Sequence, residues 1–298
     1  MSKKKNPNAK RILIIGGSGF IGKNSIIKFT EYHLGDMLNM DKQESVLGIK
    51  TIYVELKYPI LSEIRRFSPE YIIYLASLNE YECKDLKEAY KVNVEGLEKV
   101  LEELIDYDGL KKFIYVSDYK LYLPPIPFKE DNKIHTSNNY LKTKYAAERV
   151  CFKYINQFGM PIIIFRSSHI YGPYDKNPTD DITSFIESAY KYNSIHVYNN
   201  NVYDYLYITD FIKALIMSFD TLYTGILNIG TGQCYESVSI AKYISAKLQV
   251  KYVVDNNTVY NVYLNDISLA KDVLGVSSFT NINLGIDHLI EYYKYLKK

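Results

Sequence analysis

Residues 11–22 of this 298-residue chain read Arg11-Ile12-Leu13-Ile14-Ile15-Gly16-Gly17-Ser18-Gly19-Phe20-Ile21-Gly22. A short apolar run that ends in glycines and enters a helix-compatible segment predicts a strand, a tight turn and a helix. Gly16 permits the turn, Gly19 allows close approach to a phosphate, and Gly22 allows the helix to pack on the strand. The arrangement is typical of a pyrophosphate site at a helix N-terminus, and the alternative is a glycine-rich turn without a ligand.

A second informative stretch is Tyr140-Leu141-Lys142-Thr143-Lys144. Its first and last residues place a phenol and an ammonium group four positions apart, on one face of a helix. Beside a nicotinamide, such a pair can move a proton while a hydride is transferred. The alternative is a Tyr and a Lys on a solvated helix face, in a chain that contains 31 tyrosines. The two stretches together favour a dinucleotide-dependent oxidoreductase.

Composition excludes several other classes. The net charge is +2 with charges mixed along the chain, so no electrostatic footprint for nucleic acid is present. The apolar run after Arg11 is too short for a signal peptide, and no segment approaches the length of a membrane span. The 3 cysteines and 5 histidines lack metal-ligand spacing. We therefore expect a cytoplasmic protein that binds no membrane, no nucleic acid and no structural metal.

Hydrophobic periodicity predicts an α/β fold, namely a Rossmann-type doubly wound parallel sheet with a smaller C-terminal α/β substrate lobe. Strands are expected at 11–16, 37–41, 50–54, 71–76, 112–117 and 161–166. Helices are expected between them at 22–30, 61–67, 84–104 and 140–158. Residues 9–172, with about 205–230 returning, form the predicted NAD-binding domain, and residues 173–204 and 231–298 form the predicted smaller lobe.

Asp41 ends the second predicted strand. A carboxylate at this position can accept hydrogen bonds from an adenosine ribose and repel a 2′-phosphate, which favours NAD over NADP. The neighbouring Lys42 offsets part of that repulsion. The alternative is an ordinary solvated loop acid.

Several motifs in this order resemble the extended short-chain dehydrogenase/reductases, and within them the NAD-dependent epimerase/dehydratase family, most members of which act on nucleotide sugars. The motifs are Gly16-x-x-Gly19-x-x-Gly22, Leu75-Ala76-Ser77, Asn93-Val94-x-Gly96, Tyr115-Val116-Ser117, Tyr140-x-x-x-Lys144 and Arg166-x-x-His169-x-Tyr171-Gly172-Pro173. The C-terminal matches are weaker, and they comprise residues 205–210 and 228–232.

The resemblance implies a role for each of these positions. Tyr140 would be the acid/base, and Lys144 would lower the pKa of its phenol and hold the nicotinamide ribose. Asn93 would lie behind the site or act as a structural residue. The remaining residues expected to line the cofactor are Ser18, Phe20, Ile21, Glu55, Leu56, Leu75, Ala76, Ser77, Val116 and Ser167.

Asp118 departs from the family pattern, which has a Ser or Thr donating a hydrogen bond to the substrate oxygen. An ionised carboxylate cannot donate, and it would repel a developing alkoxide. Three readings remain open: Asp118 is protonated in a dry site, Ser117 or a water substitutes for it, or catalysis is weakened. The dehydratase branch has an Asp-Glu pair just afterwards, where this chain has Tyr119-Lys120, so dehydration is disfavoured.

The predicted substrate lobe contains no arginine after Arg166. Family members usually clamp the diphosphate of the substrate with arginines there, at positions that this chain fills with Tyr203 and with residues 257–261. Tyrosine does not replace the forked contacts of a guanidinium group. His169 stands where the family often has a substrate-contacting Asn, and it either contacts substrate or satisfies a strand-end carbonyl.

These observations predict an NAD(H)-dependent epimerase or keto-reductase that acts on a sugar nucleotide or related sugar. The alternative is a dinucleotide-binding protein with weak or no catalysis, which would explain Asp118 and the missing arginines. The resemblance also implies a homodimer in which helices 84–104 and 140–158 pair across a two-fold axis.

Overall fold

The computed structural model describes residues 9–43, 48–56, 62–176, 178–255 and 261–296. The chain divides into two compact units. The first consists of Met1–Tyr122, Ile134–Arg166 and Leu215–Leu227, and the second of Leu123–Lys133, Ser167–Ala214 and Asn228–Lys298. The assignment of residues 9–172 to cofactor binding remains a prediction.

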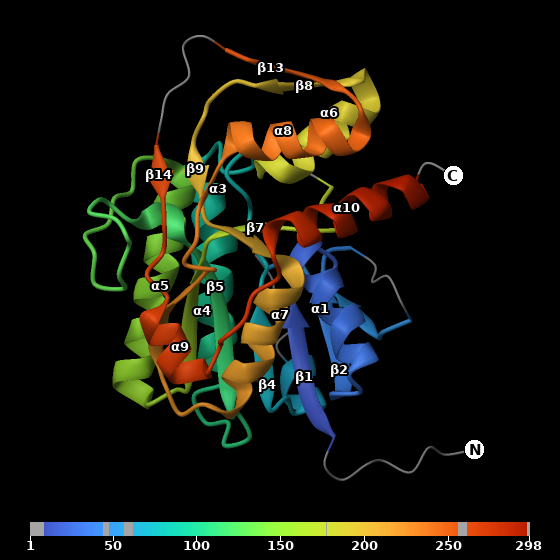
Figure 1. Ribbon diagram of the computed structural model, residues 1–298. Helices are drawn as coiled ribbons and strands as arrows, with labels where there is room; N and C mark the ends of the chain where they lie inside the picture. Colours follow the sequence, from blue (N-terminus) through green and yellow to red (C-terminus); the bar gives the residue numbers. More distant parts are fainter. Residues whose placement is uncertain (1–8, 44–47, 57–61, 177, 256–260, 297–298) are drawn as a thin grey trace. The chain divides into compact units, whose positions relative to one another are not determined.

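A seven-stranded sheet organises the first unit, with the order β11-β6-β5-β4-β1-β2-β3 (Figure 1). Its strands are β1 (Lys10–Ile15), β2 (Gly35–Asp41), β3 (Thr51–Tyr53), β4 (Tyr71–Tyr74), β5 (Lys112–Asp118), β6 (Ile162–Ser167) and β11 (Gly225–Ile229). The pairs from β3 through β5 are parallel. In this doubly wound order, β2 and β3 are added on one side of β1, and β4, β5 and β6 are added on the other side. The order confirms the predicted α/β fold class.

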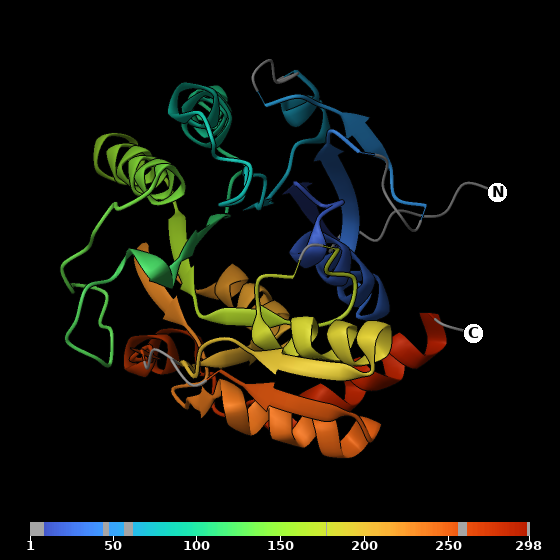
Figure 2. The same ribbon diagram turned by 90° about the horizontal axis from the view of Figure 1, so that it is seen from above.

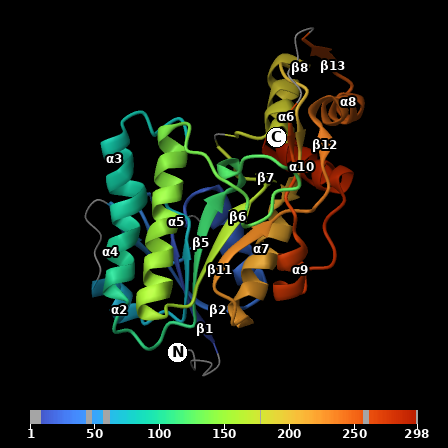
Figure 3. The same cartoon turned by 90° about the vertical axis from the view of Figure 1, so that its left-hand side faces the viewer.

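Helices follow the strands of this sheet. They are α1 (Phe20–Glu31), α2 (Ser62–Phe67), α3 (Leu86–Tyr90), α4 (Gly96–Glu103) and α5 (Asn139–Phe158), with α7 (Ile208–Met217) spanning the boundary between the units. Figure 3 shows α4 and α5 side by side on one face of the sheet. The single helix predicted over 84–104 is interrupted by a π-helical segment, Lys91–Glu95, between α3 and α4.

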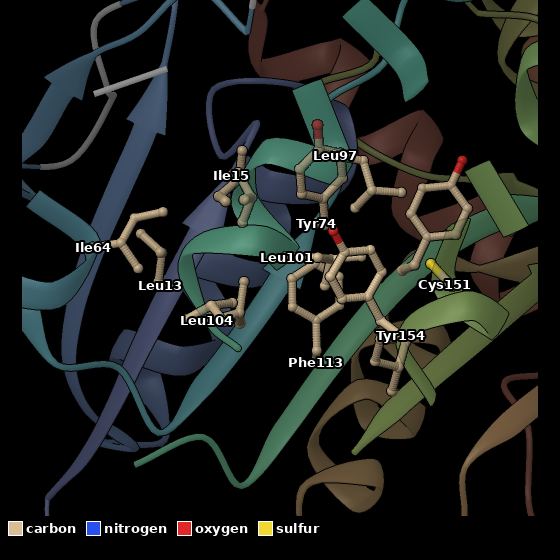
Figure 4. Close-up of a cluster of buried hydrophobic side chains, with 14 of the residues drawn as sticks. Leu13, Ile15, Ile64, Tyr74, Leu97, Leu101, Leu104, Phe113, Cys151 and Tyr154 are labelled. Carbon is tan, nitrogen blue, oxygen red and sulfur yellow. The ribbon is translucent and has the colours of Figure 1, made fainter. Parts of the chain in front are cut away.

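A large apolar cluster fixes these helices on the sheet (Figure 4). Leu97 and Leu101 of α4 and Cys151 of α5 are buried against strand residues such as Tyr74 and Phe113. Every residue of β4 and β6 is buried. Burial on both faces is expected for parallel strands covered by crossover helices, and it explains why these strands are continuous apolar runs.

The described residues of the second unit form small sheets and helices, besides the first part of α7 (Figure 2). The sheets pair β7 (His169–Tyr171) with β10 (Tyr205–Tyr207), β8 (Ser194–Val197) with β13 (Lys251–Val254), and β9 (Val202–Tyr203) with β12 (Tyr235–Glu236) and β14 (Val262–Tyr263). The helices are α6 (Asp181–Tyr192), α8 (Ser237–Leu248), α9 (Ser268–Leu274) and α10 (Ile282–Leu296). Within the described ranges, no helix combines the length and hydropathy needed to cross a membrane.

Helix α6 begins at a buried acid. Asp180 is 3% exposed, and its Oδ1 accepts a hydrogen bond from the Thr183 N–H at 2.8 Å, so it caps the helix. Its Oδ2 has no hydrogen-bond partner among the described residues. Burial raises the pKa of Asp180 to about 7, although the bond from Thr183 lowers it in part. The charged form is therefore disfavoured in the folded state.

The substitution Asp180→Asn should stabilise the protein at alkaline pH. Between the ordinary carboxyl pKa near 3.8 and the folded pKa of about 7, the unfolded chain releases a proton that the folded state retains. Rising pH therefore costs the wild type stability, on the order of a few kcal/mol near pH 8, and Asn removes this cost while keeping the cap. Thermal unfolding near pH 5 and near pH 8 measures the difference.

Asp85→Asn is the matched control, because Asp85 caps α3 from an exposed position by accepting the Glu88 N–H at 2.8 Å. We expect no comparable dependence on pH for that variant. A stability difference for Asp180→Asn that is the same at both pH values would contradict the assignment.

Candidate active site

Gly16 in the turn between β1 and α1, and Gly22 in the first turn of α1, leave no space for a side chain. Gly16 has φ +90°, and a Cβ there would lie 2.6 Å from the backbone nitrogen of Ala76. A Cβ on Gly22 would lie 2.4 Å from the Cα of Gly17. The predicted tight turn at Gly16 is present, whereas Gly22 packs helix against turn rather than helix against strand.

Gly19 differs from these glycines because the space beside it is open. A Cβ there would meet only the Gly16 carbonyl oxygen, at 3.5 Å. Gly19 is the N-cap of α1, with no side-chain cap and no acidic residue in the first turn. The N–H groups of the first turn therefore have neither a capping acceptor nor a competing carboxylate. Open space beside N–H groups that no described side chain caps suits a phosphate.

Asn39, which the sequence analysis did not single out, holds this turn. Its fully buried side chain accepts a hydrogen bond from the Gly17 N–H at 2.9 Å. Its amide donates to Ser18 Oγ at 3.1 Å and to Thr51 Oγ1 at 3.2 Å. One sequence feature could have predicted this role, namely that Asn39 lies between the apolar residues Leu38 and Met40 of a buried strand. A buried polar side chain in such a strand requires hydrogen-bond partners.

Asp41 lies next to the same turn. Its Oδ2 accepts a hydrogen bond from the Ser18 N–H at 2.9 Å, and its Oδ1 accepts one from the Gln43 N–H at 3.0 Å. Each carboxylate oxygen keeps a further lone pair, so both can also accept a ribose hydroxyl.

The predicted residues after β4 are brought to this turn. The Leu75 and Ala76 N–H groups both donate to the Ile15 carbonyl, at 2.8 and 3.0 Å. Ser77 Oγ donates to the Leu78 carbonyl at 3.0 Å. Leu75 and Ala76 therefore continue the pairing to β1 up to the glycines, and the side chain of Ser77 serves the following loop.

The other residues predicted near the cofactor take different positions. Glu55 is exposed and accepts a hydrogen bond from the Tyr53 hydroxyl at 3.2 Å. Leu56 packs against Gly96, where a Cβ would lie 3.0 Å from the Cβ of Leu56. Phe20 and Ile21 begin α1, and Ser167 ends β6 as a buried residue.

Asn93 lies in the π-helical segment and joins two parts of the first unit. Its Oδ1 accepts the Leu78 N–H at 2.6 Å, and its Nδ2 donates to Thr143 Oγ1 at 2.9 Å. Thr143 Oγ1 in turn donates to the Tyr140 carbonyl at 2.8 Å. Asn93 thus connects the loop after β4 to the start of α5, which agrees with a supporting role behind Tyr140.

Tyr140 and Asp118 form the central contact of the candidate site. The Tyr140 hydroxyl donates a hydrogen bond to Asp118 Oδ2 at 2.9 Å. Asp118 Oδ1 accepts a second bond from the Lys120 N–H, also at 2.9 Å. Both oxygens of Asp118 therefore act as hydrogen-bond acceptors, one from the phenol and one from the backbone.

Lys144 lies on the same helix face as Tyr140. Its buried ammonium donates to the Val116 carbonyl at 2.9 Å and lies 5.7 Å from the centroid of the Tyr140 ring. Burial lowers the pKa of Lys144. Burial, together with the Asp118 carboxylate, raises the pKa of Tyr140 well above its ordinary value. The pKa of Tyr140 is therefore raised, and not lowered as expected from Lys144, because desolvation and the Asp118 carboxylate disfavour the phenolate.

Ser117 is directed away from Tyr140, into a buried ion pair. Its Oγ donates to Glu148 Oε1 at 2.5 Å. Arg166 donates to the same carboxylate through two nitrogens, at 2.9 and 2.6 Å, and lies 4.6 Å from the centroid of the Tyr122 ring. The Ser117 hydroxyl is thus engaged with Glu148, which disfavours the reading in which Ser117 replaces the family hydroxyl.

In the second unit, the predicted substrate residues His169 and Tyr203 stack on each other. Their ring centroids are 4.2 Å apart with an interplanar angle of 19°, and Tyr263 stacks on the other side of Tyr203 at 5.1 Å and 8°. All three rings are half-buried. Tyr203 therefore belongs to an aromatic column, and residues 257–260, where a second family arginine is absent, lie outside the described residues.

Asp204, next to Tyr203, anchors a glycine turn that the sequence matched to the family. Its carboxylate accepts hydrogen bonds from the Thr231 N–H at 2.9 Å, the Thr231 hydroxyl at 2.6 Å and the Gly232 N–H at 3.1 Å. The residue that precedes the first weak C-terminal motif thus holds the turn of the second. Among the described residues, no group of three metal-ligating side chains occurs.

A family model described as NAD dependent epimerase/dehydratase family matches residues 12–230, which include the glycine turn, Asp118, Tyr140 and Lys144. The chain belongs to the NAD-dependent epimerase/dehydratase family. The predicted resemblance is thereby confirmed. Among curated members of the epimerase/dehydratase family, the UDP-glucuronate 4-epimerase of Thermodesulfobacterium geofontis is 25% identical, over 95% of each chain.

Two further comparisons define the range of the family. The dTDP-D-glucose 4,6-dehydratase of Homo sapiens is 29% identical over 78% of this chain and 73% of its own length. A solved structure, the UDP-N-acetylglucosamine 4-epimerase from Methanobrevibacter ruminantium M1 in complex with UDP-N-acetylmuramic acid, has a TM-score of 0.87 and 20% identity, covering 97% of this chain and 99% of that chain. The structural likeness supports the fold, and the relatives perform more than one reaction.

The buried ion pair behind the site yields a stability prediction. Glu148 and Arg166 have side-chain exposures of 1% and 4%, so Glu148→Gln leaves a buried guanidinium without its counter-charge. We expect a loss of about 3 kcal/mol in the free energy of unfolding. Urea denaturation measures it.

The control is Glu98→Gln, which removes a half-exposed pair with Lys153 at 2.8 Å. That change should cost less than about 1 kcal/mol. Equal urea midpoints of unfolding for the two variants would show that the buried ion pair stabilises the protein no more than the half-exposed pair does.

Proposed function

We propose that this protein binds NAD and transfers a hydride on a sugar nucleotide or related sugar, as an epimerase or a keto-reductase. The observation that carries the proposal is the position of Tyr140 and Lys144 at the carboxyl end of β5. The glycine turn follows the carboxyl end of β1 in the same parallel sheet. In open parallel sheets of this kind, ligands bind beside the carboxyl ends of the strands. Relatives named for UDP-glucuronate and dTDP-glucose support the substrate class.

The residues of the glycine turn fit a dinucleotide. The open space at Gly19 and the uncapped start of α1 would take the diphosphate. Asp41 would accept the hydroxyls of the adenosine ribose and would repel a 2′-phosphate, which favours NAD over NADP. Solved structures of similar fold are complexes of related proteins with NAD, including a UDP-glucose 4-epimerase of Thermus thermophilus.

NAD supplies the hydride acceptor and donor in this proposal. Tyr140 would exchange a proton with the substrate oxygen, because its phenol lies at the proposed ligand edge of the sheet. Lys144, fixed by the Val116 carbonyl, would keep its remaining N–H groups for the hydroxyls of the nicotinamide ribose. His169 and Tyr203 are the proposed substrate contacts in the second unit.

Lys120 supports epimerisation or keto reduction rather than dehydration. Dehydration needs a base that removes a proton from carbon, and the residue here is an ammonium paired with Glu80 at 3.2 Å. Burial lowers the pKa of Lys120, but Asp118 and Glu80 outweigh it, so that the pKa is raised overall. A lysine that stays protonated cannot accept the proton.

A second candidate function is dinucleotide binding with weak or no turnover. It is favoured by Asp118, which accepts rather than donates hydrogen bonds beside Tyr140. It is also favoured by the absence of arginine beyond Arg166, whose own guanidinium is committed to Glu148.

The proposal includes a homodimer in which the helical segment 84–104, which contains α3 and α4, pairs with α5 across a two-fold axis. Large apolar side chains remain exposed on two of these helices, namely Leu86 (38%) and Tyr90 (42%) on α3 and Tyr145 (36%) and Phe158 (44%) on α5. A second copy of this chain would cover them. Light scattering coupled to gel filtration distinguishes the dimer from a monomer.

Tyr140→Phe tests the catalytic proposal most simply. Loss of the phenolic proton should reduce hydride transfer by about 100-fold or more, while NAD binding and the melting temperature stay unchanged. Reduction of bound NAD is followed by its absorbance with UDP-glucuronate, UDP-N-acetylglucosamine and dTDP-glucose as trial substrates. Mass spectrometry of molecules released from the denatured protein identifies any dinucleotide or sugar nucleotide retained through purification.

Tyr145→Phe is the matched control, because Tyr145 lies on the same helix and is 36% exposed. It should behave as the wild type. Unchanged turnover in Tyr140→Phe would reject the proposed acid/base, and a wild type that binds NAD but transfers no hydride would favour the second candidate.

A further inference from the structure

We propose that Asp118 is the proton acceptor behind Tyr140, so that phenol and carboxylate act together as a two-residue proton relay. The inference deepens the proposed function and rests on it. Its starting point is the 2.9 Å hydrogen bond in which the Tyr140 hydroxyl donates to Asp118 Oδ2. A carboxylate has no proton to give, so the phenol must direct its own proton toward Asp118.

This direction leaves the Tyr140 oxygen with lone pairs for the substrate. A phenol that donates to Asp118 can accept a hydrogen bond from a sugar hydroxyl with the same oxygen. The phenol then serves as a bridge between the substrate and the carboxylate rather than as a base by itself. Asp118 is the group that finally holds the proton.

The surrounding charges support the relay over a free phenolate. Lys144 carries only donors and gives one of them to the Val116 carbonyl, so it cannot accept the proton. Burial and the Asp118 carboxylate raise the pKa of Tyr140. A phenolate next to an ionised Asp118 would place two negative charges within hydrogen-bond distance, which is unfavourable.

The carboxylate is fixed in place and reaches water. Asp118 Oδ1 is held by the Lys120 N–H, where Asp118 caps the 3₁₀ helix Tyr119–Leu121. Asp118 is half-buried, and the neighbouring Lys120–Glu80 pair has side-chain exposures of 33% and 41%. A proton on Asp118 can therefore exchange with solvent, as net oxidation or reduction of a substrate requires.

Several charged or titratable groups face this pair. They are Lys120 on the 3₁₀ helix, Glu80 on the loop after β4, Lys144 on α5 and Tyr115 on β5. The two ammonium groups balance the two carboxylates, Asp118 and Glu80. One additional proton on Asp118 therefore leaves the cluster with a single positive charge, and a phenolate would leave it with a single negative one.

The step balances as follows. Oxidation of a sugar alcohol would break the C–H bond of its carbinol carbon, whose hydride NAD would accept, and its O–H bond, whose proton would pass to the Tyr140 oxygen. The Tyr140 O–H bond breaks at the same time, and its proton bonds to Asp118 Oδ2. The products would be a ketone, the reduced cofactor, a neutral phenol and a protonated carboxyl. Reduction runs the same transfers in reverse.

Asp118→Asn removes the acceptor and retains the shape of the side chain. Its amide oxygen can still accept the Lys120 N–H or the phenol, but it cannot take up a proton at these pH values. Oxidation should then be about 100-fold slower near neutral pH. It should also rise by about tenfold per pH unit into the alkaline range, because only the phenolate can act as the base, whereas the wild type stays flat there.

Asp118→Ala is the second variant, because alanine lacks a carboxylate and does not add the hydroxyl that the family has at this position. It should show the same alkaline rise. Asp36→Asn, at an exposed position at the start of β2, is the matched control and should retain the rate and pH profile of the wild type.

A readout without cofactor or turnover uses ¹³Cζ-tyrosine NMR, with the Tyr140 signal assigned by Tyr140→Phe. Removal of the carboxylate should let the Tyr140 phenol ionise at a pH lower by roughly one unit or more. An identical titration in wild type and Asp118→Asn overturns the relay, as does an unchanged pH–rate profile in a wild type that turns over. A wild type that transfers no hydride with any trial substrate contradicts the proposed function itself.

Discussion

The absence of a side chain at Gly16 is the constraint on which the candidate site depends. At φ +90° and with the Ala76 backbone 2.6 Å from the position of a Cβ, only glycine lets β1 turn sharply into α1 at this point. The sharp turn places the start of α1 beside the carboxyl ends of the strands. Asn39 and Asp41 of β2 then hold the Gly17 and Ser18 N–H groups, so the turn is fixed from the neighbouring strand.

The register between α5 and β5 is the second determinant. Tyr140, Lys144 and Glu148 lie four residues apart on one helix face. They contact three adjacent residues of β5: Tyr140 binds Asp118, Lys144 binds the Val116 carbonyl, and Glu148 accepts from Ser117. A slip of α5 by one turn would break all three contacts at once. The ion pair of Glu148 with Arg166 adds a buried charge interaction to the same register, so the position of the phenol is set by the fold of the whole unit.

Much of this arrangement was predictable from the sequence. Glycine spacing, apolar runs and the helical spacing of Tyr140 and Lys144 are local signals, and they predicted the sheet, the turn and the face of α5. The orientation of Ser117 was also readable, because Phe113, Tyr115 and Ser117 alternate along β5 and the first two pack into the core that α5 covers. The departure at Asp118 was visible, but its hydrogen bond to the phenol was not, since that contact joins residues 22 positions apart.

Other features have no comparable local signal. The π-helical segment at Lys91–Glu95 has the same apolar spacing as an ordinary helix, and only its tertiary contacts through Asn93 distinguish it. The strands β9, β12 and β14 of the second unit contain two residues each, too few for any alternation. The pairing of Asp204 with the turn at Thr231 depends on a contact across 27 residues.

Calorimetric titration of NAD into the wild type and Gly19→Thr tests the central claim, that the β1–α1 turn is built to hold a diphosphate. Gly19 has φ −77° and ψ −179°, which any residue adopts, and threonine caps helices about as well as glycine. The account therefore predicts an unchanged melting temperature together with NAD binding that is weaker by at least about tenfold, or 1.4 kcal/mol. Equal affinity for NAD in the two proteins, or no binding to either, would contradict it.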